Sequence, residues 1–278
     1  MSKIKKALER LKSESQLKEI KEEKAERKEA ISEKLEKIVY TKTKVIHVDP
    51  EKLKENKIVA IDEEDPLTDQ FKVLRTRILN RTRAEGKKTI QVSGFGIDEG
   101  KSIIASNLAI AMAKETRQTT LLVDLDLRNP SIHKLFCLGD VKGLKDYFEK
   151  GVPLEELFIN PGIPKFTILP AGGKIIGAPE ILGSPKMETM VKELRERYPD
   201  RYIIFDTPGM NICPDPLIVS EYMDAILLVA RVGVTDQDAI KSVMKIVPKE
   251  KLLGIVLNDF IWADEIMSYY KYRYKYYL

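Results

Sequence analysis

The stretch that decides the fold is QVSGFGIDEGKSIIASNLAIAMAKE, residues 91–115. It begins inside a β-branched apolar run that stops at Ser93, and it ends in an amphipathic pattern that predicts a helix from Lys101 to Lys114. A glycine-rich turn lies between the two. Strand, turn and helix therefore follow one another in the order that phosphate binding requires.

The turn is a variant of the phosphate-loop pattern GxxxxGK[ST]. The pattern wants its first glycine at position 95, where this chain has Phe95 between Gly94 and Gly96. Backbone N–H groups and the helix N-terminus would face the phosphates, Lys101 would add a charge, and the Ser102 hydroxyl could bind Mg²⁺. A turn that merely caps a helix is the alternative. The predicted nucleotide-contacting residues are Gly94, Phe95, Gly96, Ile97, Asp98, Glu99, Gly100, Lys101, Ser102 and Ile103.

Three aspartates lie where this chemistry needs carboxylates. Asp124 and Asp126 belong to LLVDLDLRNP, and Asp206 ends YIIFD. Ligand sites of open parallel sheets lie at the carboxyl ends of strands, so we expect these side chains near Lys101. There they can hold the water shell of a metal ion, and one can accept a hydroxyl proton. For Asp124 alone, a helix N-cap is the alternative.

Short apolar runs alternate with helical stretches after residue 86. The runs cover residues 89–93, 119–124, 166–171, 202–206, 225–230 and 252–258. Fully apolar strands separated by helices predict the α/β class, with a mostly parallel sheet covered by helices on both faces. Asp65-Pro66 followed by apolar residues at helical spacing predicts a helix that begins near Pro66. We assign this ATPase domain to residues 65–262.

Both ends of the chain differ from the domain in composition. Residues 1–40 are mostly charged and predict a long solvated helix, with coiled-coil pairing as the alternative, and 41–64 read as a linker. Residues 263–278 predict a flexible tail whose tyrosines alternate with Lys and Arg. It could present hydroxyl groups to an active site, or stack on nucleic acid or carbohydrate. The candidate phosphoacceptors are Tyr269, Tyr270, Tyr272, Tyr274, Tyr276 and Tyr277.

Bulk composition narrows the function classes. Basic and acidic residues, 47 and 43, nearly cancel to a net charge of +4, so no nucleic-acid partner is expected. No apolar run approaches the roughly 20 residues of a membrane helix, and no signal-peptide pattern opens the chain. Two cysteines at no zinc-binding spacing suit a reducing compartment. We therefore expect a cytoplasmic protein.

The segments SGFGIDEGKS, VDLDLRNPSIH and FDTP together resemble the three Walker motifs of the bacterial tyrosine kinases of capsule and exopolysaccharide synthesis. The phosphate loop of that family descends from the MinD and ParA type of ATPase. The resemblance covers about residues 65–260 and implies ATP- and Mg²⁺-dependent autophosphorylation of the tyrosine tail. Lys101, Asp124 and Asp126 would then be catalytic, with Asp124 as base. The implied metal ligands are Ser102, Asp124, Asp126 and Asp206.

The same resemblance implies partners. A membrane-bound polysaccharide co-polymerase would activate the kinase through a cytoplasmic tail and hold it at the inner face of the plasma membrane. A homo-oligomer, ring or dimer, is also implied, although DQFKVLR, with Asp69, Lys72 and Arg75, is only similar to the ring-forming Glu-x-x-Arg-x-x-Arg motif. The start SKIKKALERL resembles relatives from exosortase-associated loci. Arg128 and His133 also match family positions.

Two other functions stay open. A MinD- or ParA-like ATPase switch would carry a signature lysine where this chain has Gly96. A degenerate nucleotide site is suggested by Phe95 and by Ile97, which stands where the family often has proline. Asn258, at the end of the last apolar run, could contact adenine or form a turn.

Overall fold

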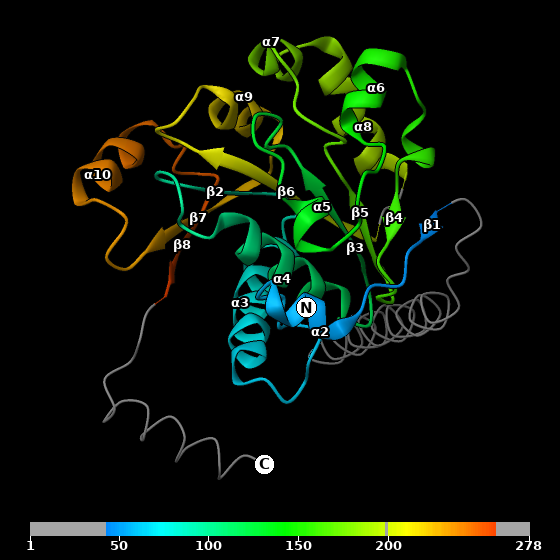
Figure 1. Ribbon diagram of the computed structural model, residues 1–278. Coiled ribbons are helices and arrows are strands. Elements are labelled where there is room, and N and C mark those ends of the chain that lie inside the picture. The colour runs from blue at the N-terminus through cyan, green and yellow to red at the C-terminus, as the bar shows by residue number, and fades with distance from the viewer. Residues whose placement is uncertain (1–42, 198–199, 260–278) are drawn as a thin grey trace, which may run out of the picture.

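The computed structural model describes residues 43–197 and 200–259. The charged helix predicted for 1–40 and the tyrosine tail predicted for 263–278 lie outside this part. The described chain forms one eight-stranded sheet in the order β1-β4-β5-β3-β6-β2-β7-β8 (Figure 1). Within the same residues, none of the helices has the length and apolar character needed to cross a bilayer.

The six predicted strands are all present. They are β2 (Thr89–Gly94), β3 (Thr119–Asp124), β5 (Phe166–Leu169), β6 (Arg201–Gly209), β7 (Ala225–Arg231) and β8 (Leu252–Asn258). The sequence did not reveal β1 (Lys44–Val45) and β4 (Ile159–Asn160), because two-residue strands leave no periodic pattern. In the described sheet, neighbouring strands run parallel apart from β4 and β5, so the prediction of a mostly parallel sheet is confirmed.

Helices cover both faces of the sheet, as predicted (Figure 1). They are α2 (Pro50–Glu55), α3 (Pro66–Thr82), α4 (Lys101–Ala113), α5 (Ile132–Leu135), α6 (Leu144–Lys150), α7 (Ala178–Leu182), α8 (Pro185–Arg197), α9 (Asp215–Tyr222) and α10 (Gln237–Ile246), with a 3₁₀ turn at Leu154–Glu156. Helix α3 begins where the sequence predicted. Asp65 caps it by accepting a hydrogen bond from the Leu67 N–H at 2.8 Å, and Pro66 is its first residue.

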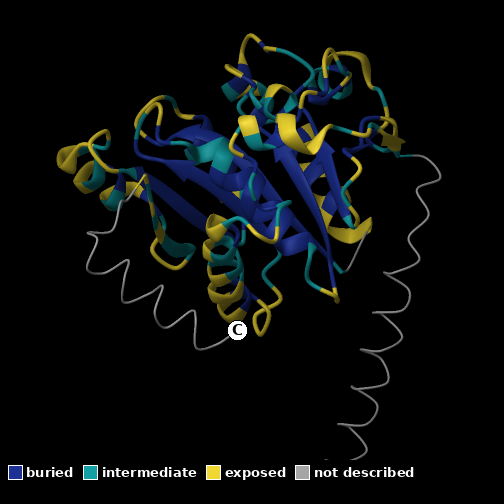
Figure 2. Cartoon of the chain, turned by 60° about the horizontal axis from the view of Figure 1, so that its bottom comes forward, coloured by how far each residue is buried: buried dark blue, intermediate teal, exposed yellow. Residues whose placement is uncertain are grey.

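The sheet is apolar on both faces because alternate residues of a strand point to opposite sides. On β3, Leu122 packs in the cluster formed with α3 and α4, whereas Leu121 and Val123 pack in the cluster formed with α8 and α9. A third cluster joins Phe95 and β7 to α10. Figure 2 shows the inner strands buried and the helices exposed on their outer sides, whereas β1 is exposed and β8 is partly exposed. Polar side chains also lie within the strands: Gln91, in the middle of β2, is buried, and its amide donates to the Pro216 carbonyl at 2.8 Å.

The segment that we predicted as a linker, 41–64, enters the core from β1 onward. Its buried apolar residues are Leu53, Ile58 and Ala60. Asn107 on α4 holds it in place by accepting hydrogen bonds from the N–H groups of Val59 and Ala60 at 2.8 and 2.9 Å. The same amide donates to the Lys57 carbonyl at 2.8 Å. Between α2 and α3 the sequence shows no periodic pattern, because the Asn107 side chain, and not a helix or strand, is the hydrogen-bond partner of the backbone at residues 57, 59 and 60.

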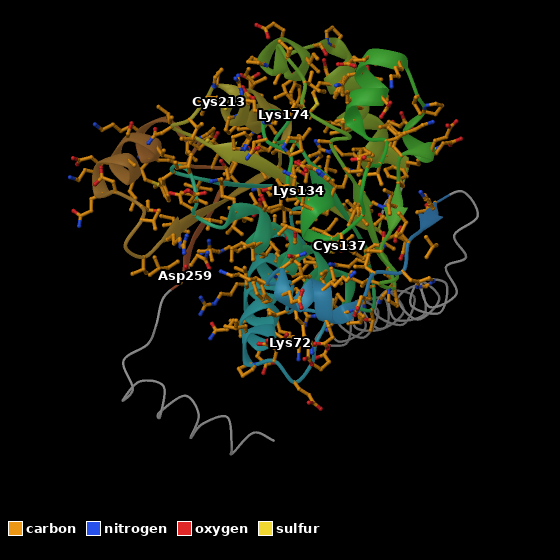
Figure 3. All side chains as sticks on the ribbon, viewed as in Figure 1. Lys72, Lys134, Cys137, Lys174, Cys213 and Asp259 are labelled. Carbon is orange, nitrogen blue, oxygen red and sulfur yellow. The ribbon has the colours of Figure 1, made fainter. Side chains whose placement is uncertain are left out.

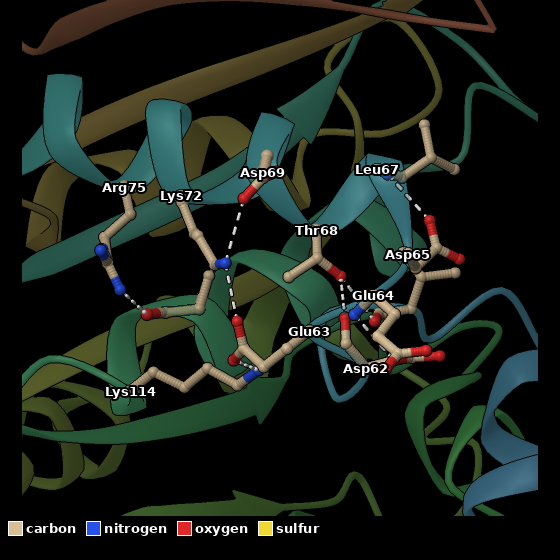
Figure 4. Close-up of polar contacts among 12 residues, drawn as sticks. Asp62, Glu63, Glu64, Asp65, Leu67, Thr68, Asp69, Lys72, Arg75 and Lys114 are labelled. Atoms are coloured by element: carbon tan, nitrogen blue, oxygen red, sulfur yellow. Dashed lines mark hydrogen bonds and ion pairs between the residues drawn. The ribbon is translucent and has the colours of Figure 1, made fainter. Parts of the chain in front are cut away.

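Charged contacts tie the turn before α3 to α3 and α4 (Figure 4). Glu63 forms ion pairs with Lys72, at 2.7 Å, and with Lys114. Arg75 donates to the Ala111 carbonyl at 3.0 Å. The two cations of the segment that resembles the ring-forming motif are therefore engaged within the subunit.

Replacing Asn107 by Ala should lower the unfolding free energy by about 2 to 3 kcal/mol, because two buried N–H groups lose their acceptor. Urea denaturation would measure the loss, with Asn80→Ala on the exposed side of α3 as the control. Equal stability of both variants would contradict the role of Asn107 in holding the segment before the domain.

Candidate active site

The phosphate loop joins the central strand β2 to the N-terminus of α4. Gly100 caps α4 with φ = +81°, a left-handed conformation that favours glycine, and a Cβ there would lie 2.4 Å from Asn258 Nδ2. Phe95, the departure from the motif, is fully buried in the cluster with α10. Its ring anchors the loop to the core, so the departure has a packing function. Ile97 is 66 % exposed at the tip of the loop.

Lys101 bends back over its own loop. Its Nζ donates to the Gly96 carbonyl at 2.6 Å and lies 3.8 Å from Glu99 Oε2. The ammonium thus already contacts two oxygens of its own loop, and an incoming phosphate would compete with these oxygens for it. The loop thus places a cation at the N-terminus of α4. The cation and the helix N-terminus both favour the binding of an anion.

The structure brings the predicted carboxylates together. Asp124 and Asp206 are paired in register on the adjacent strands β3 and β6, and both are buried. Asp124 Oδ2 accepts hydrogen bonds from the N–H groups of Ser131 and Ile132 at 3.1 Å each, at the start of α5. The N-cap of α5 is Ser131, so Asp124 is not itself the N-cap of a helix and contacts the start of α5 from the end of β3. Asp126 is half-buried and accepts from the Asn129 N–H at 2.8 Å.

Asp206 is the unusual member of this group. Both of its carboxylate oxygens are buried, and neither has a hydrogen-bond partner among the described residues. Burial raises its pKa, the charge of Asp124 raises it further, and the nearby Ser102 and Lys101 favour its charged form. The Ser102 side chain lies near enough to the carboxylate to lower the pKa of Asp206, although the contact does not have the geometry of a hydrogen bond. A buried, unpartnered carboxylate beside a hydroxyl and an ammonium fits a site for a bound cation.

Asp124 shares this electrostatic setting. Burial raises its pKa to about 7, and the charge of Asp126 adds to the rise, whereas the N–H groups of Ile132 and Ser131 oppose it. Keeping both carboxylates charged costs free energy, because they lie in register on neighbouring strands and away from water. A divalent cation would supply the missing positive charge.

Arg128, which the sequence indicated, forms a second element of the site with Asp215, which the sequence did not reveal. Arg128 Nε and Nη2 donate to the two oxygens of the fully buried Asp215 at 2.8 and 2.9 Å. This bidentate pair fixes the chain after Asp126 to the start of α9. His133 Nδ1 is buried with no hydrogen-bond partner within the described residues. Asp215 carries no local motif that could have marked it.

Asn258 and Asp259 bring the end of β8 to the phosphate loop. Asn258 Nδ2 donates to the Glu99 carbonyl at 3.0 Å. Asp259 directly follows β8 and is the last residue that the structure describes (Figure 3). The predicted adenine contact of Asn258 stays a prediction. The six candidate phosphoacceptor tyrosines lie outside the described residues.

A mostly parallel sheet whose central strand runs through a glycine-rich loop into a helix is the fold of the P-loop ATPases. No family model matches the chain. It is 26% identical over 208 residues to the tyrosine-protein kinase ptk of Acinetobacter johnsonii, a match that spans 74% of this chain but 28% of that protein. It is 28% identical over 204 residues to the tyrosine-protein kinase YwqD of Bacillus subtilis, covering 72% of this chain and 85% of that one.

A solved structure shares the fold. The structure of the chimerical protein CapA2B2 superposes with a TM-score of 0.69 at 24% identity, over 84% of this chain and 100% of that one. The homologues of the chain are bacterial tyrosine kinases, so the resemblance predicted from the three motifs is confirmed.

The carboxylate pair predicts a pH dependence of stability without nucleotide or metal. The folded state keeps a proton on Asp124 up to a pKa of about 7, and the unfolded chain releases it near 3.8, so the unfolding free energy should fall as the pH rises between these values. Asp206→Asn should flatten this slope, because burial and the charge of Asp124 raise the pKa of Asp206 as well, and its own contribution to the pH dependence would be lost.

Urea denaturation from about pH 5 to about pH 8 would measure both slopes. Asp238→Asn, an exposed carboxylate on α10, is the control. A slope that Asp206→Asn leaves unchanged would contradict the raised pKa of Asp206 in the folded state.

Proposed function

We propose that the chain is an ATP-dependent protein-tyrosine autokinase that phosphorylates its C-terminal tyrosine cluster and regulates capsule or exopolysaccharide synthesis or export. The observation that carries the proposal is the buried Asp206 carboxylate, unpaired within the described residues, beside Lys101 and Ser102 in a P-loop fold. The named tyrosine kinases among the homologues support the choice of tyrosine as acceptor.

Mg·ATP fits the residues present. Within the described chain, no three His, Cys, Asp or Glu side chains form a metal site by themselves. Mg²⁺ commonly binds one or two protein oxygens and completes its shell with water and phosphate oxygens, so this finding suits it. Ser102 and Asp206 would hold the ion, with Asp124 and Asp126 acting on its water shell. Bound in this way, Mg²⁺ would neutralise charge on the phosphates.

The side chains of the site divide the work of phosphoryl transfer. Lys101 would leave the Gly96 carbonyl and stabilise the charge on the transferred group, and the loop N–H groups would hold the phosphates. Asp124 would accept the tyrosine hydroxyl proton as the oxygen bonds to phosphorus and ADP leaves. A carboxyl whose pKa is about 7 is well matched to taking up a proton near neutral pH.

An ATPase switch of the MinD or ParA type is the second candidate. Those proteins act through a signature lysine, and this chain has Gly96 at that position. The tyrosine cluster at the end of the chain has no use in a switch of that kind. The kinase is therefore the better supported function.

The kinase function brings partners with it. We propose that a membrane-bound polysaccharide co-polymerase activates the chain through a cytoplasmic tail and holds it at the inner face of the plasma membrane. We also propose a homo-oligomer in which one subunit presents its tyrosines to a neighbour. Phosphates would reverse the positive charge of a tail that carries Lys271, Arg273 and Lys275, and so would weaken such an assembly.

Purified full-length protein incubated with Mg·ATP should carry phosphate on tyrosines between residues 269 and 277, as seen by mass spectrometry of the C-terminal peptide. Lys101→Met should abolish the label, because the charge on the phosphates is lost. Lys241→Met, on the exposed face of α10, should keep it. ATP hydrolysis without tyrosine phosphate in the wild type would favour the switch instead.

Asp124→Asn should separate binding from turnover. We expect the Kd for Mg·ATP to change by less than about tenfold while the phosphorylation rate falls by about a hundredfold or more, because the base acts in the chemical step. Calorimetry and a labelling time course would measure the two. Equal loss of binding and rate would contradict the assignment of Asp124 as base.

A further inference from the structure

The phosphate loop is braced from inside by a buried carboxylate. Glu99 is 1 % exposed, and its Oε2 accepts a hydrogen bond from the Phe95 N–H at 2.8 Å, across the width of the loop. Its Oε1 accepts from the Thr235 hydroxyl at 2.7 Å, and that hydroxyl accepts from the Arg231 N–H at 2.8 Å. The orientation of the Thr235 hydroxyl is therefore fully determined. A residue between β7 and α10 thus holds the loop through Glu99.

A second set of contacts reaches the loop backbone. Arg231 Nη1 donates to the Asp98 carbonyl at 2.9 Å, and its Nε donates to Asp259 at 2.6 Å. Asn258 adds the bond to the Glu99 carbonyl described above. The guanidinium therefore bridges the phosphate loop and the residue that follows β8.

The loop needs this support because its backbone is strained. Asp98 has φ = +56° and Gly100 has φ = +81°, so two left-handed residues flank Glu99. A residue with a Cβ adopts this conformation rarely, and it persists where the surroundings hold it. The Asp98 carbonyl accepts a hydrogen bond from Arg231, so this contact holds the strained residue directly.

We propose that Thr235, Arg231 and Asp259, which we call the loop clasp, position the phosphate loop for the nucleotide and link its shape to the start of the C-terminal segment. The proposal rests on the nucleotide binding proposed above. The clasp residues act through Glu99 and Asp98, so they are positioning residues. Asp259 lies ten positions before Tyr269 in the sequence, and a shift of Asp259 would reach the loop through one guanidinium.

Thr235→Val is the first test, because it keeps the shape of the side chain and removes the hydroxyl. Glu99 Oε1 would then be buried without its partner, and the loop would leave its binding shape. We expect the Kd and the KM for Mg·ATP to rise about tenfold, with a smaller fall in kcat at saturating ATP. Thr235→Ser should restore the Kd to within about twofold of wild type, since it restores the donor. Thr189→Val, on the exposed side of α8, is the matched control.

Two further variants test the link to the end of β8. Arg231→Lys keeps the charge but cannot bond to both Asp98 and Asp259 through a planar fork, so it should weaken Mg·ATP binding about as much as Thr235→Val. Asp259→Asn should weaken it by about threefold, because this ion pair is partly exposed and screened by water.

Calorimetry on the full-length chain, with thermal melting of each variant, separates the outcomes. Selective loss of affinity in Thr235→Val with rescue by Thr235→Ser supports the clasp. If wild type binds Mg·ATP and Thr235→Val binds it equally well, the clasp is overturned and the kinase function stands. An equal loss of melting temperature and affinity in both Thr235 variants would also overturn it, because it would show a purely structural role. If wild type fails to bind Mg·ATP, the proposed function fails and the clasp with it.

Discussion

The structure depends on the burial of β2 in the middle of the sheet. This strand is hydrogen-bonded to β6 on one side and to β7 on the other, and helices cover both of its faces. At its carboxyl end the chain turns into α4, so the phosphate loop is attached to a strand that is held by neighbours on both sides.

The same burial concentrates charge at one edge. Parallel strands end together, so Asp124 and Asp206 meet in register although 82 positions separate them in the chain. Burial raises the pKa of both carboxyls. The charge of Asp124 adds to the rise at Asp206, and the charge of Asp126 adds to the rise at Asp124. A bound cation would relieve this cost, so the buried carboxylates support the proposed binding of Mg²⁺.

The loop itself is held on three sides. Phe95 anchors it in the core, Lys101 closes over it through the Gly96 carbonyl, and Thr235 and Arg231 reach it from the far side of β7. The aromatic residue at the position of the expected glycine therefore has a packing role that accounts for this departure from the motif. It replaces flexibility with packing, and the contacts with Glu99 and Asp98 hold the remaining backbone.

The sequence by itself determined the elements and the chemistry. Fully apolar runs identified six strands, Asp65-Pro66 located the start of α3, and the order of Lys101, Asp124 and Asp206 identified the site, because each of these signals is local. Tertiary structure decided the pairing across the chain. Glu99 forms a hydrogen bond with Thr235, 136 residues further along the chain, and Arg128 pairs with Asp215, 87 residues further along. Asn107 forms hydrogen bonds with a segment that the sequence predicted as a linker. Such contacts leave no periodic pattern, because they arise only when the strand order brings distant loops to the same edge of the sheet.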